Sequence, residues 1–280
     1  MGPYLRADDS VPLGDWTVRP AISRPLQGFQ RRLQPLSTSH PVESNKSEPR
    51  CVGHDEASRA IRLGSTRHEL RNHRKGNIGS AVARHFAQNG VTVEVATANG
   101  PEAVASLAEA FGPHIVPTEL SHALRANVVV LAVPFEAVKD LVGQVDDWAG
   151  RIIVDATNAI DYTDFSPADL GGRPSSDLVG DWAVNARIVK AFGHTWAKVL
   201  ARAPGDGRDG RRVLFLSGNH PDANAEIASL IRKFGFEPLD PGRNDQGGLL
   251  QQFGGPLTTK SFVSQAIGGS NPAEMDLAQP

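Results

Sequence analysis

Two runs of consecutive apolar residues limit what this chain can fold into more than any other feature. They span residues 127–133, Asn-Val-Val-Val-Leu-Ala-Val, and residues 151–155, Arg-Ile-Ile-Val-Asp. Unbroken apolar runs are typical of strands buried on both faces, as in parallel sheets covered by helices. Segments with helical periodicity lie between these runs and the neighbouring strand-like segments. Strands that alternate with helices over short loops predict an α/β fold with right-handed crossovers.

The regular pattern begins at Gly76. Helices are expected at residues 77–88, 101–111, 119–124, 135–142, 177–184, 195–201 and 221–234. Strands are expected at residues 91–96, 114–116, 127–133, 151–155, 186–189, 211–216 and 236–239. A polar loop is expected from Asn158 to about Ser175, and a Gly- and Gln-rich loop follows the last strand. We therefore assign an α/β domain to residues 76–260 and a polar tail to residues 261–280.

Residues 1–75 differ in composition from the rest of the chain. They carry a net charge of +5, against −7 for residues 76–280, and 7 of the 20 prolines. They show no sustained period of 2 or 3.6, and a proline interrupts them about every eight residues. We interpret them as an aperiodic N-terminal segment that is disordered or mistranslated. The misassigned start or shifted reading frame would then lie just before Gly76.

Composition also excludes several classes of protein. A single cysteine, Cys51, rules out an internal disulfide framework and fits a reducing compartment. The longest apolar run has six residues, too short to span a membrane, and no secretory signal opens the chain. The basic residues of 1–75 are scattered among acidic ones, so nucleic acid is not an expected partner. We expect a cytoplasmic protein with small-molecule cofactors and no bound metal; a homodimer is left open.

The motif that carries chemistry is Arg74-Lys-Gly-Asn-Ile-Gly79 at the start of the first expected helix. It occupies the place of the dinucleotide fingerprint G-x-G-x-x-G, in which free amides at the helix start bind a pyrophosphate. Two glycines alone are a weak match. The succession of helix, strand, helix and buried strand behind them strengthens it. By contrast, His68 and His73 resemble a zinc signature but have the wrong spacing for one helical face.

Eight short motifs occur in the order of a known family. They cover residues 76–82, 100–102, 128–134, 153–158, 171–176, 189–192, 212–217 and 248–257. Together they resemble the NADPH-dependent reductases of the deazaflavin coenzyme F-420, which share their nucleotide-binding domain with pyrroline-5-carboxylate reductases. The resemblance covers about two thirds of the chain. It implies hydride transfer between NADP and a deazaflavin or flavin co-substrate, chemistry that belongs mostly to the cofactors themselves. No catalytic side chain is therefore expected.

The resemblance also implies a set of site residues. For the cofactor these are Gly76, Asn77, Ile78, Gly79, Thr97, Asn99, Ala132, Val133, Pro134, Thr157 and Asn158, and for the substrate His194. Relatives commonly carry an Arg where this chain has Asn99, so a charged contact to the 2′-phosphate of NADP is missing and the preference over NAD is open.

Several of these residues have a simpler alternative. Glu94 is either an acid for the ribose of NAD or an ordinary residue of an alternating strand, which we favour. Pro134 also fits as the first residue of a helix, and Asn158 as a turn residue. For His194 we favour an exposed loop histidine over one that lines the ring pocket.

The expected fold is a Rossmann-like, doubly wound parallel sheet. Its first strand is absent from the place where the fingerprint requires it. Residues 66–73, directly before the motif, contain Leu70 as their one apolar residue, and Arg74 replaces the first glycine. We therefore expect this strand to be missing or corrupted, and NADP binding to be weak. Two other functions stay open: reduction of another small substrate such as an imine, and a degenerate, non-catalytic nucleotide-binding protein.

Overall fold

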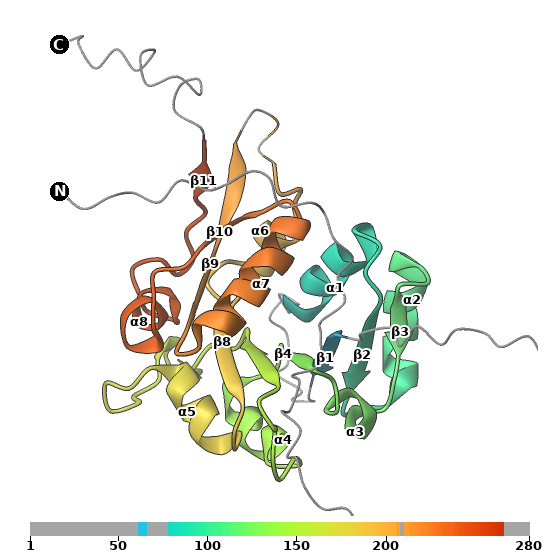
Figure 1. The fold of residues 1–280 in the computed structure, drawn as a ribbon, viewed down its shortest axis with the longest axis horizontal. Helices are drawn as coiled ribbons and strands as arrows, with labels where there is room; N and C mark the ends of the chain where they lie inside the picture. Colours follow the sequence, from blue (N-terminus) through green and yellow to red (C-terminus); the bar gives the residue numbers. More distant parts are fainter. Residues whose placement is uncertain (1–60, 66–77, 206, 208–209, 266–280) are drawn as a thin grey trace, which may run out of the picture. The chain divides into compact units, whose positions relative to one another are not determined.

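The computed structural model describes residues 61–65, 78–205, 207 and 210–265, all of which belong to one unit, Asp55–Pro280. At its centre six parallel strands lie in the order β3-β2-β1-β4-β5-β8 (Figure 1). Their bounds are β1 Ile61–Ser65, β2 Val93–Thr97, β3 Ile115–Pro117, β4 Val128–Leu131, β5 Ile152–Asp155 and β8 Arg187–Ala191. This is the order of a Rossmann sheet, so the expected α/β, doubly wound fold is confirmed.

The structure contains the first strand of the sheet, which the sequence predicted to be missing. Ile61–Ser65 forms β1 and pairs in parallel with β2 and with β4, Ile61 lying opposite Val93 and Val128. The prediction was wrong because it required the strand to lie directly before Gly76, where the fingerprint normally places it. Here the strand lies further upstream, where Ile61 and Leu63 alternate in the sequence. Residues 66–77 separate it from the first helix, and both flanking strands have a partner.

The sheet continues beyond β8 with a strand of the opposite direction. β9 (Arg211–Gly218) is antiparallel to β8, and β10 (Glu237–Leu239) and β11 (Val263–Ser264) both pair with β9. β11 lies in the segment that was expected to be a polar tail. A separate hairpin of β6 (Ile160–Asp161) and β7 (Ser166–Pro167) lies in the expected polar loop.

Helices cover both faces of the sheet, as the apolar runs require. The helices are α1 Ile78–Gln88, α2 Ala105–Phe111, α3 Leu120–Ala123, α4 Val138–Val142, α5 Ser175–Trp182, α6 Ala197–Leu200, α7 Pro221–Lys233 and α8 Leu249–Gln251. Short 3-10 turns precede α2 (Pro101–Val104) and α4 (Phe135–Ala137), and a π turn, Asn244–Gly248, precedes α8. No described helix is long and apolar enough to cross a membrane.

The core has two layers that follow the alternation of the strands. On one face Val128, Val130 and Val154 pack with α1 and α7; on the other, Val129 and Ile153 pack with α4 and α5. β4 and β5 therefore bury both faces, and burying one such side chain contributes about 1.5–3 kcal/mol.

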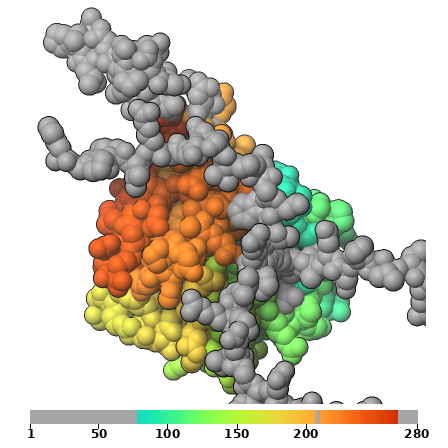
Figure 2. All heavy atoms as spheres, viewed as in Figure 1, coloured from blue at the N-terminus to red at the C-terminus, as the bar shows by residue number. Residues whose placement is uncertain are grey.

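The C-terminal part of the unit returns to α5. The side-chain amide of Asn244 donates a hydrogen bond of 2.9 Å to Asp177, and the Gln252 side chain accepts one from the Ser175 amide. The yellow α5 region and the orange C-terminal elements accordingly share one surface in Figure 2.

Candidate functional site

The candidate site lies at the carboxyl edge of the parallel strands. Because the six central strands run the same way, their carboxyl ends share one edge, which is where open α/β sheets bind ligands. Along this edge the structure places Ile78 and Gly79 at the start of α1, Thr97 at the end of β2 with Asn99 just after it, Ala132, Val133 and Pro134 after β4, Thr157 and Asn158 after β5, and His194 after β8. Gly76 and Asn77, like His68 and His73, lie outside the described residues. Ten of the twelve predicted residues are thus brought to one edge.

The chain reverses its winding direction between β1 and β4, the switch point where dinucleotides bind in such folds. α1 packs against β1 and β2 and begins with Ile78 and Gly79. Its first amides have no partner within the helix, which suits an anionic group such as a phosphate.

The turn after β2 is closed by its own side chains. The Thr97 hydroxyl donates to the carbonyl oxygen of Gly100 at 3.3 Å and accepts from the amide of Asn99 at 3.2 Å. Asn99 is exposed. Gly100 has φ +84, and a Cβ there would lie 2.9 Å from the carboxylate of Glu102, so this carboxylate folds back over the turn.

Glu94 is the second residue of β2. It lies opposite Arg62 of β1 and Val116 of β3, and its carboxylate is 3.4 Å from Nε2 of His122. The strand ends three residues later, at Thr97, about 10 Å further along the chain. The structure therefore supports the strand interpretation over a ribose acid.

Pro134 is the N-cap of the 3-10 turn Phe135–Ala137 after β4. Its φ is −55 and its carbonyl oxygen accepts a hydrogen bond from the Ala137 amide at 3.0 Å, so it lies one residue before the first helical position that was expected for it. Val133 is buried, and Ala132 and Pro134 are half-buried.

The turns after β5 and β8 are joined to each other. The side-chain amide of Asn158 donates a hydrogen bond of 3.0 Å to the carbonyl oxygen of Gly193. A Cβ on Gly193 would lie 3.1 Å from the carbonyl oxygen of Ala156 and 3.2 Å from that of Thr157, so the glycine allows the two backbones to approach. Asn158 thus bridges two turns, which goes beyond the local turn role considered as its alternative.

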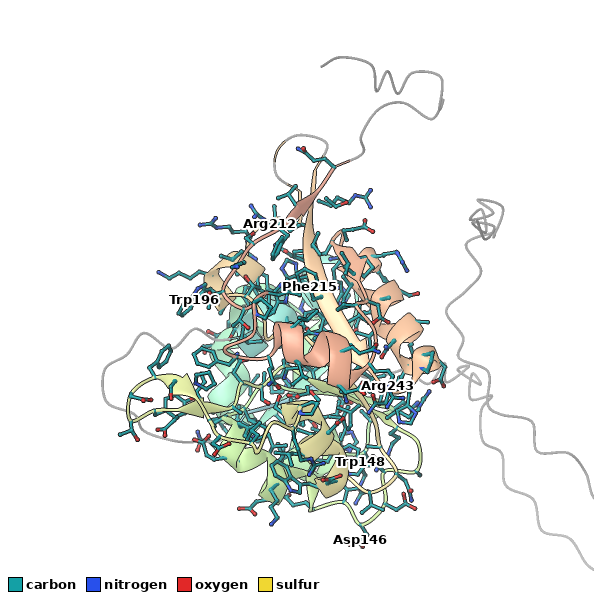
Figure 3. The ribbon with its side chains drawn as sticks, turned by 90° about the vertical axis from the view of Figure 1, so that its left-hand side faces the viewer. Asp146, Trp148, Trp196, Arg212, Phe215 and Arg243 are labelled. Carbon is teal, nitrogen blue, oxygen red and sulfur yellow. The ribbon has the colours of Figure 1, made fainter. Side chains whose placement is uncertain are left out.

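His194 is buried, so the favoured interpretation of an exposed loop histidine was wrong. Its side chain is 2% exposed and its ring packs edge-on against Phe215 of β9, 5.1 Å between centroids. Burial lowers the pKa of His194 to about 4, so the ring is neutral near pH 7. Phe215 belongs to β9, which is antiparallel to β8, and no local sequence pattern predicts this contact. Figure 3 shows Phe215 inside the fold and Trp196, two residues after His194, directed outward.

Two charged residues that the sequence analysis did not select lie beneath these turns. Asp155 ends β5, Lys190 lies opposite it in β8, and the Lys190 ammonium is 3.1 Å from the Asp155 carboxylate. Their signal was present: each is a charged residue inside an apolar strand buried on both faces, and such residues are rarely buried without a partner.

Three buried polar atoms around these turns have no hydrogen-bond partner among the described residues. They are Oδ1 of Asn158, Nδ1 of His194 and Oγ of Ser175, the first residue of α5. Buried polar groups are nearly always paired in native proteins, so such atoms suit a ligand that supplies the missing partner. All three belong to uncharged side chains at pH 7. Within the described part of the chain, no cluster of three or more His, Cys, Asp or Glu side chains could hold a metal ion.

Comparison with known proteins agrees with this arrangement. A family model described as NADP oxidoreductase, coenzyme F420-dependent, matches residues 75–159, which include every predicted site residue except His194. A solved structure, hypothetical protein SMa0349 from Sinorhizobium meliloti, is 42% identical, with a TM-score of 0.67; the match covers 74% of this chain and 96% of that one.

Two more distant matches each cover part of the chain. Metalloreductase STEAP3 of Rattus norvegicus is 25% identical over 167 residues, 60% of this chain and 32% of that protein, so the matched region spans about a third of this curated relative. A pyrroline-5-carboxylate reductase of Coxiella burnetii is 18% identical, with a TM-score of 0.48, over 70% of this chain and 65% of that one. Residues 75–159 thus match the family of coenzyme F420-dependent NADP oxidoreductases, and the chain is similar over about three quarters of its length to the Sinorhizobium protein.

Proposed function

We propose that this protein transfers a hydride between NADP(H) and a deazaflavin or flavin-type acceptor at the carboxyl edge of β4, β5 and β8. The observation that carries the proposal is the gathering of the predicted residues along this edge, next to three buried polar atoms without partners. When bound, the nicotinamide supplies the hydride and the acceptor ring takes it up. The protein has to hold the two rings together and exclude water.

The residues present fit a nicotinamide dinucleotide. The start of α1 offers amides to the phosphates, and the turn after β2 lies where the adenosine ribose is recognised. At the other end, Asn158 and His194 offer an oxygen and a ring nitrogen to an uncharged group such as a carboxamide. With β1 in place, one physical reason to expect weak NADP binding is removed. The other, Arg74 in place of the first glycine, lies outside the described residues.

The protonation state of His194 favours a deazaflavin or flavin over an imine as the acceptor of the hydride. Reduction of an imine needs a proton donor beside the substrate, and a histidine whose pKa is about 4 is neutral at pH 7 and carries no proton to spare. The Lys190 ammonium is held by Asp155 and by the carbonyl oxygen of Thr157. A deazaflavin or flavin that takes its proton from water needs neither His194 nor Lys190 as a proton donor.

Steady-state oxidation of NADPH with three acceptors tests the proposal. The oxidised deazaflavin coenzyme, FMN and a cyclic imine are each offered at saturating NADPH, with NADH as the alternative donor. We expect saturable turnover with the deazaflavin or FMN and none with the imine. Turnover with the imine alone would replace the proposed acceptor, and NADPH binding without turnover would indicate a nucleotide-binding protein. A cytoplasmic location and a homodimer stay predictions.

A further inference from the structure

A buried ion pair lies directly under the turns of the candidate site. Asp155 and Lys190 are opposite each other in the register of β5 and β8, at or next to the carboxyl end of each strand. Their side chains are 0% and 2% exposed, and Nζ of Lys190 lies 3.1 Å from Oδ2 of Asp155. The pair is therefore screened from solvent and is fixed to the two strands that carry Asn158 and His194.

Both partners are also bonded to the neighbouring turn and helix. Oδ2 of Asp155 accepts the Ser176 hydroxyl at 2.6 Å, and Oδ1 accepts the Thr157 hydroxyl at 2.6 Å and the Thr157 amide at 2.9 Å. Lys190 donates a second hydrogen bond, of 3.2 Å, to the carbonyl oxygen of Thr157. The peptide groups on both sides of Thr157 are thus held, one by each member of the pair.

The protonation state of the carboxyl is settled by these contacts. Burial on its own raises the pKa of Asp155, but the Lys190 ammonium and the hydrogen bonds from Ser176 and Thr157 outweigh it and hold the pKa below its usual value. Asp155 is therefore ionised at neutral pH, and the pair carries two full charges in the interior.

A pair of this kind gives little net stability. Removing two charges from water costs about as much as their attraction returns, and well-packed apolar replacements are often as stable. Here the pair instead holds the two neighbouring turns in one orientation. It anchors Thr157, the next residue Asn158 reaches across to Gly193, and Gly193 carries His194.

We propose that Asp155 and Lys190 are positioning residues, which fix the two site turns relative to each other so that Asn158 and His194 meet the bound ring at one geometry. Neither touches the reacting atoms. This role rests on the proposed hydride transfer, because it is the placement of the rings that the pair controls. Small misplacements of reacting groups cost large factors in rate, about 100-fold for 1 Å.

The test removes both charges together. In the double variant Asp155→Asn, Lys190→Met, Oδ1 of the asparagine can still accept from Thr157, its side-chain NH2 can donate to the Ser176 hydroxyl, and no charge is left unpaired in the interior. Lys190→Met alone would bury an uncompensated carboxylate and is expected to misfold. Arg187→Met is the matched control, because it breaks an ion pair to Asp222 at the amino end of the same strand.

Two measurements are made on the full chain. Amide hydrogen exchange is followed at Thr157 and Gly193, and kcat and the KM for NADPH are measured with the acceptor that supports turnover. We expect exchange at both amides to rise at least tenfold in the double variant while α7 and β4 keep their protection. We also expect kcat to fall at least tenfold with KM within threefold, and Arg187→Met to change neither.

Unchanged exchange at Thr157 and Gly193, or unchanged kcat in the folded double variant, would overturn the positioning role. The exchange measurement needs no cofactor. If the unmodified protein turned over no acceptor, the proposed function would fail, and exchange at the two amides would still decide whether the pair fixes the turns.

Discussion

The side-chain amide of Asn158 donates a hydrogen bond of 3.0 Å to the carbonyl oxygen of Gly193 and so joins the turn after β5 to the turn after β8. The two residues are 35 apart in the sequence, and each follows a central strand of the sheet. The contact makes one unit of two separate loops at the edge where the cofactor is proposed to bind. A change in either turn is therefore expected to displace the other.

Replacing Asn158 by alanine is expected to weaken NADPH binding. The variant leaves the buried carbonyl oxygen of Gly193 without its donor, which costs about 1–3 kcal/mol of folding stability, and removes Oδ1 from the proposed ring site. Denaturant unfolding and a fluorescence titration with NADPH measure the two effects. Asn89→Ala is the control, because it breaks a similar bond of 2.9 Å to the carbonyl oxygen of His85 at the end of α1. Equal NADPH affinity in both variants would count against a role for Asn158 in binding.

Replacing Gly193 by alanine is expected to separate the two turns. Its Cβ would lie 3.1 Å and 3.2 Å from two backbone carbonyl oxygens, which cannot yield as a side chain can. Overpacking of this kind costs about 1–3 kcal/mol. We expect a lower unfolding midpoint and at least tenfold lower kcat. Gly180→Ala in α5 is the control: its Cβ meets Ile188 at an ordinary 3.5 Å, and a helical alanine is favoured by about 0.5–1 kcal/mol. If both variants kept full activity, the close approach at Gly193 would have no functional meaning.

The burial of His194 predicts that the folded protein loses stability in mild acid. The pKa of His194 is lowered to about 4, whereas in the unfolded chain it has its ordinary value of 6.5, so between these values the unfolded state alone binds the proton. The contribution of the buried neutral ring to the free energy of unfolding is complete above pH 6.5 and falls as the pH drops toward 4. It amounts to about 3 kcal/mol at most. Unfolding free energies measured from pH 7 to pH 4 should decrease less steeply in His194→Gln. His85, whose pKa burial also lowers, is present in both proteins and cancels. Identical pH dependence would contradict the buried, neutral ring.

The turn after β2 predicts that the protein binds NADPH only slightly more tightly than NADH. Replacing Asn99 by arginine is expected to increase that difference in affinity. Asn99 is exposed there, and the Glu102 carboxylate folds over the same turn, where it disfavours a phosphate. Asn99→Arg is expected to raise the NADPH-to-NADH affinity ratio by about tenfold, since a hydrogen bond to a charged group contributes about 1.5–3 kcal/mol. Isothermal titration with both nucleotides measures it. Asn99→Gln adds a similar reach without charge and should leave the ratio unchanged; an equal shift in both variants would refute the charge argument.

The strands and helices with strong local signals could be predicted from the sequence. The apolar runs predicted β4 and β5 within two residues, and proline and glycine marked the two ends of α7 and of the segment formed by α2 and the 3-10 turn before it. β1 was not predicted because the strand was expected directly before Gly76. Local sequence does not fix how far a strand lies from its glycine motif. β6, β7 and β11 are two-residue strands whose formation depends on distant partners, so no local periodicity could reveal them.

Much of the candidate site followed from one rule, that parallel strands end at a common edge. The rule placed Thr97, Pro134 and Asn158 correctly without any contact being known. It could not show that His194 is buried, because that depends on packing against Phe215 of the antiparallel strand β9. The Asp155–Lys190 pair shows the same limit: each charge was visible in an apolar strand, but their meeting depends on the register of β5 with β8.

Direct transfer of a labelled hydride tests the central claim most directly. The full chain is mixed with NADPH deuterated at the transferring position of nicotinamide C4 and with the oxidised deazaflavin coenzyme, and both products are analysed by mass spectrometry. The account predicts one NADP⁺ for each reduced deazaflavin, with the deuterium retained on the deazaflavin ring carbon. Oxidation of NADPH with the deuterium lost to water, or no oxidation with either the deazaflavin or a flavin, would contradict it.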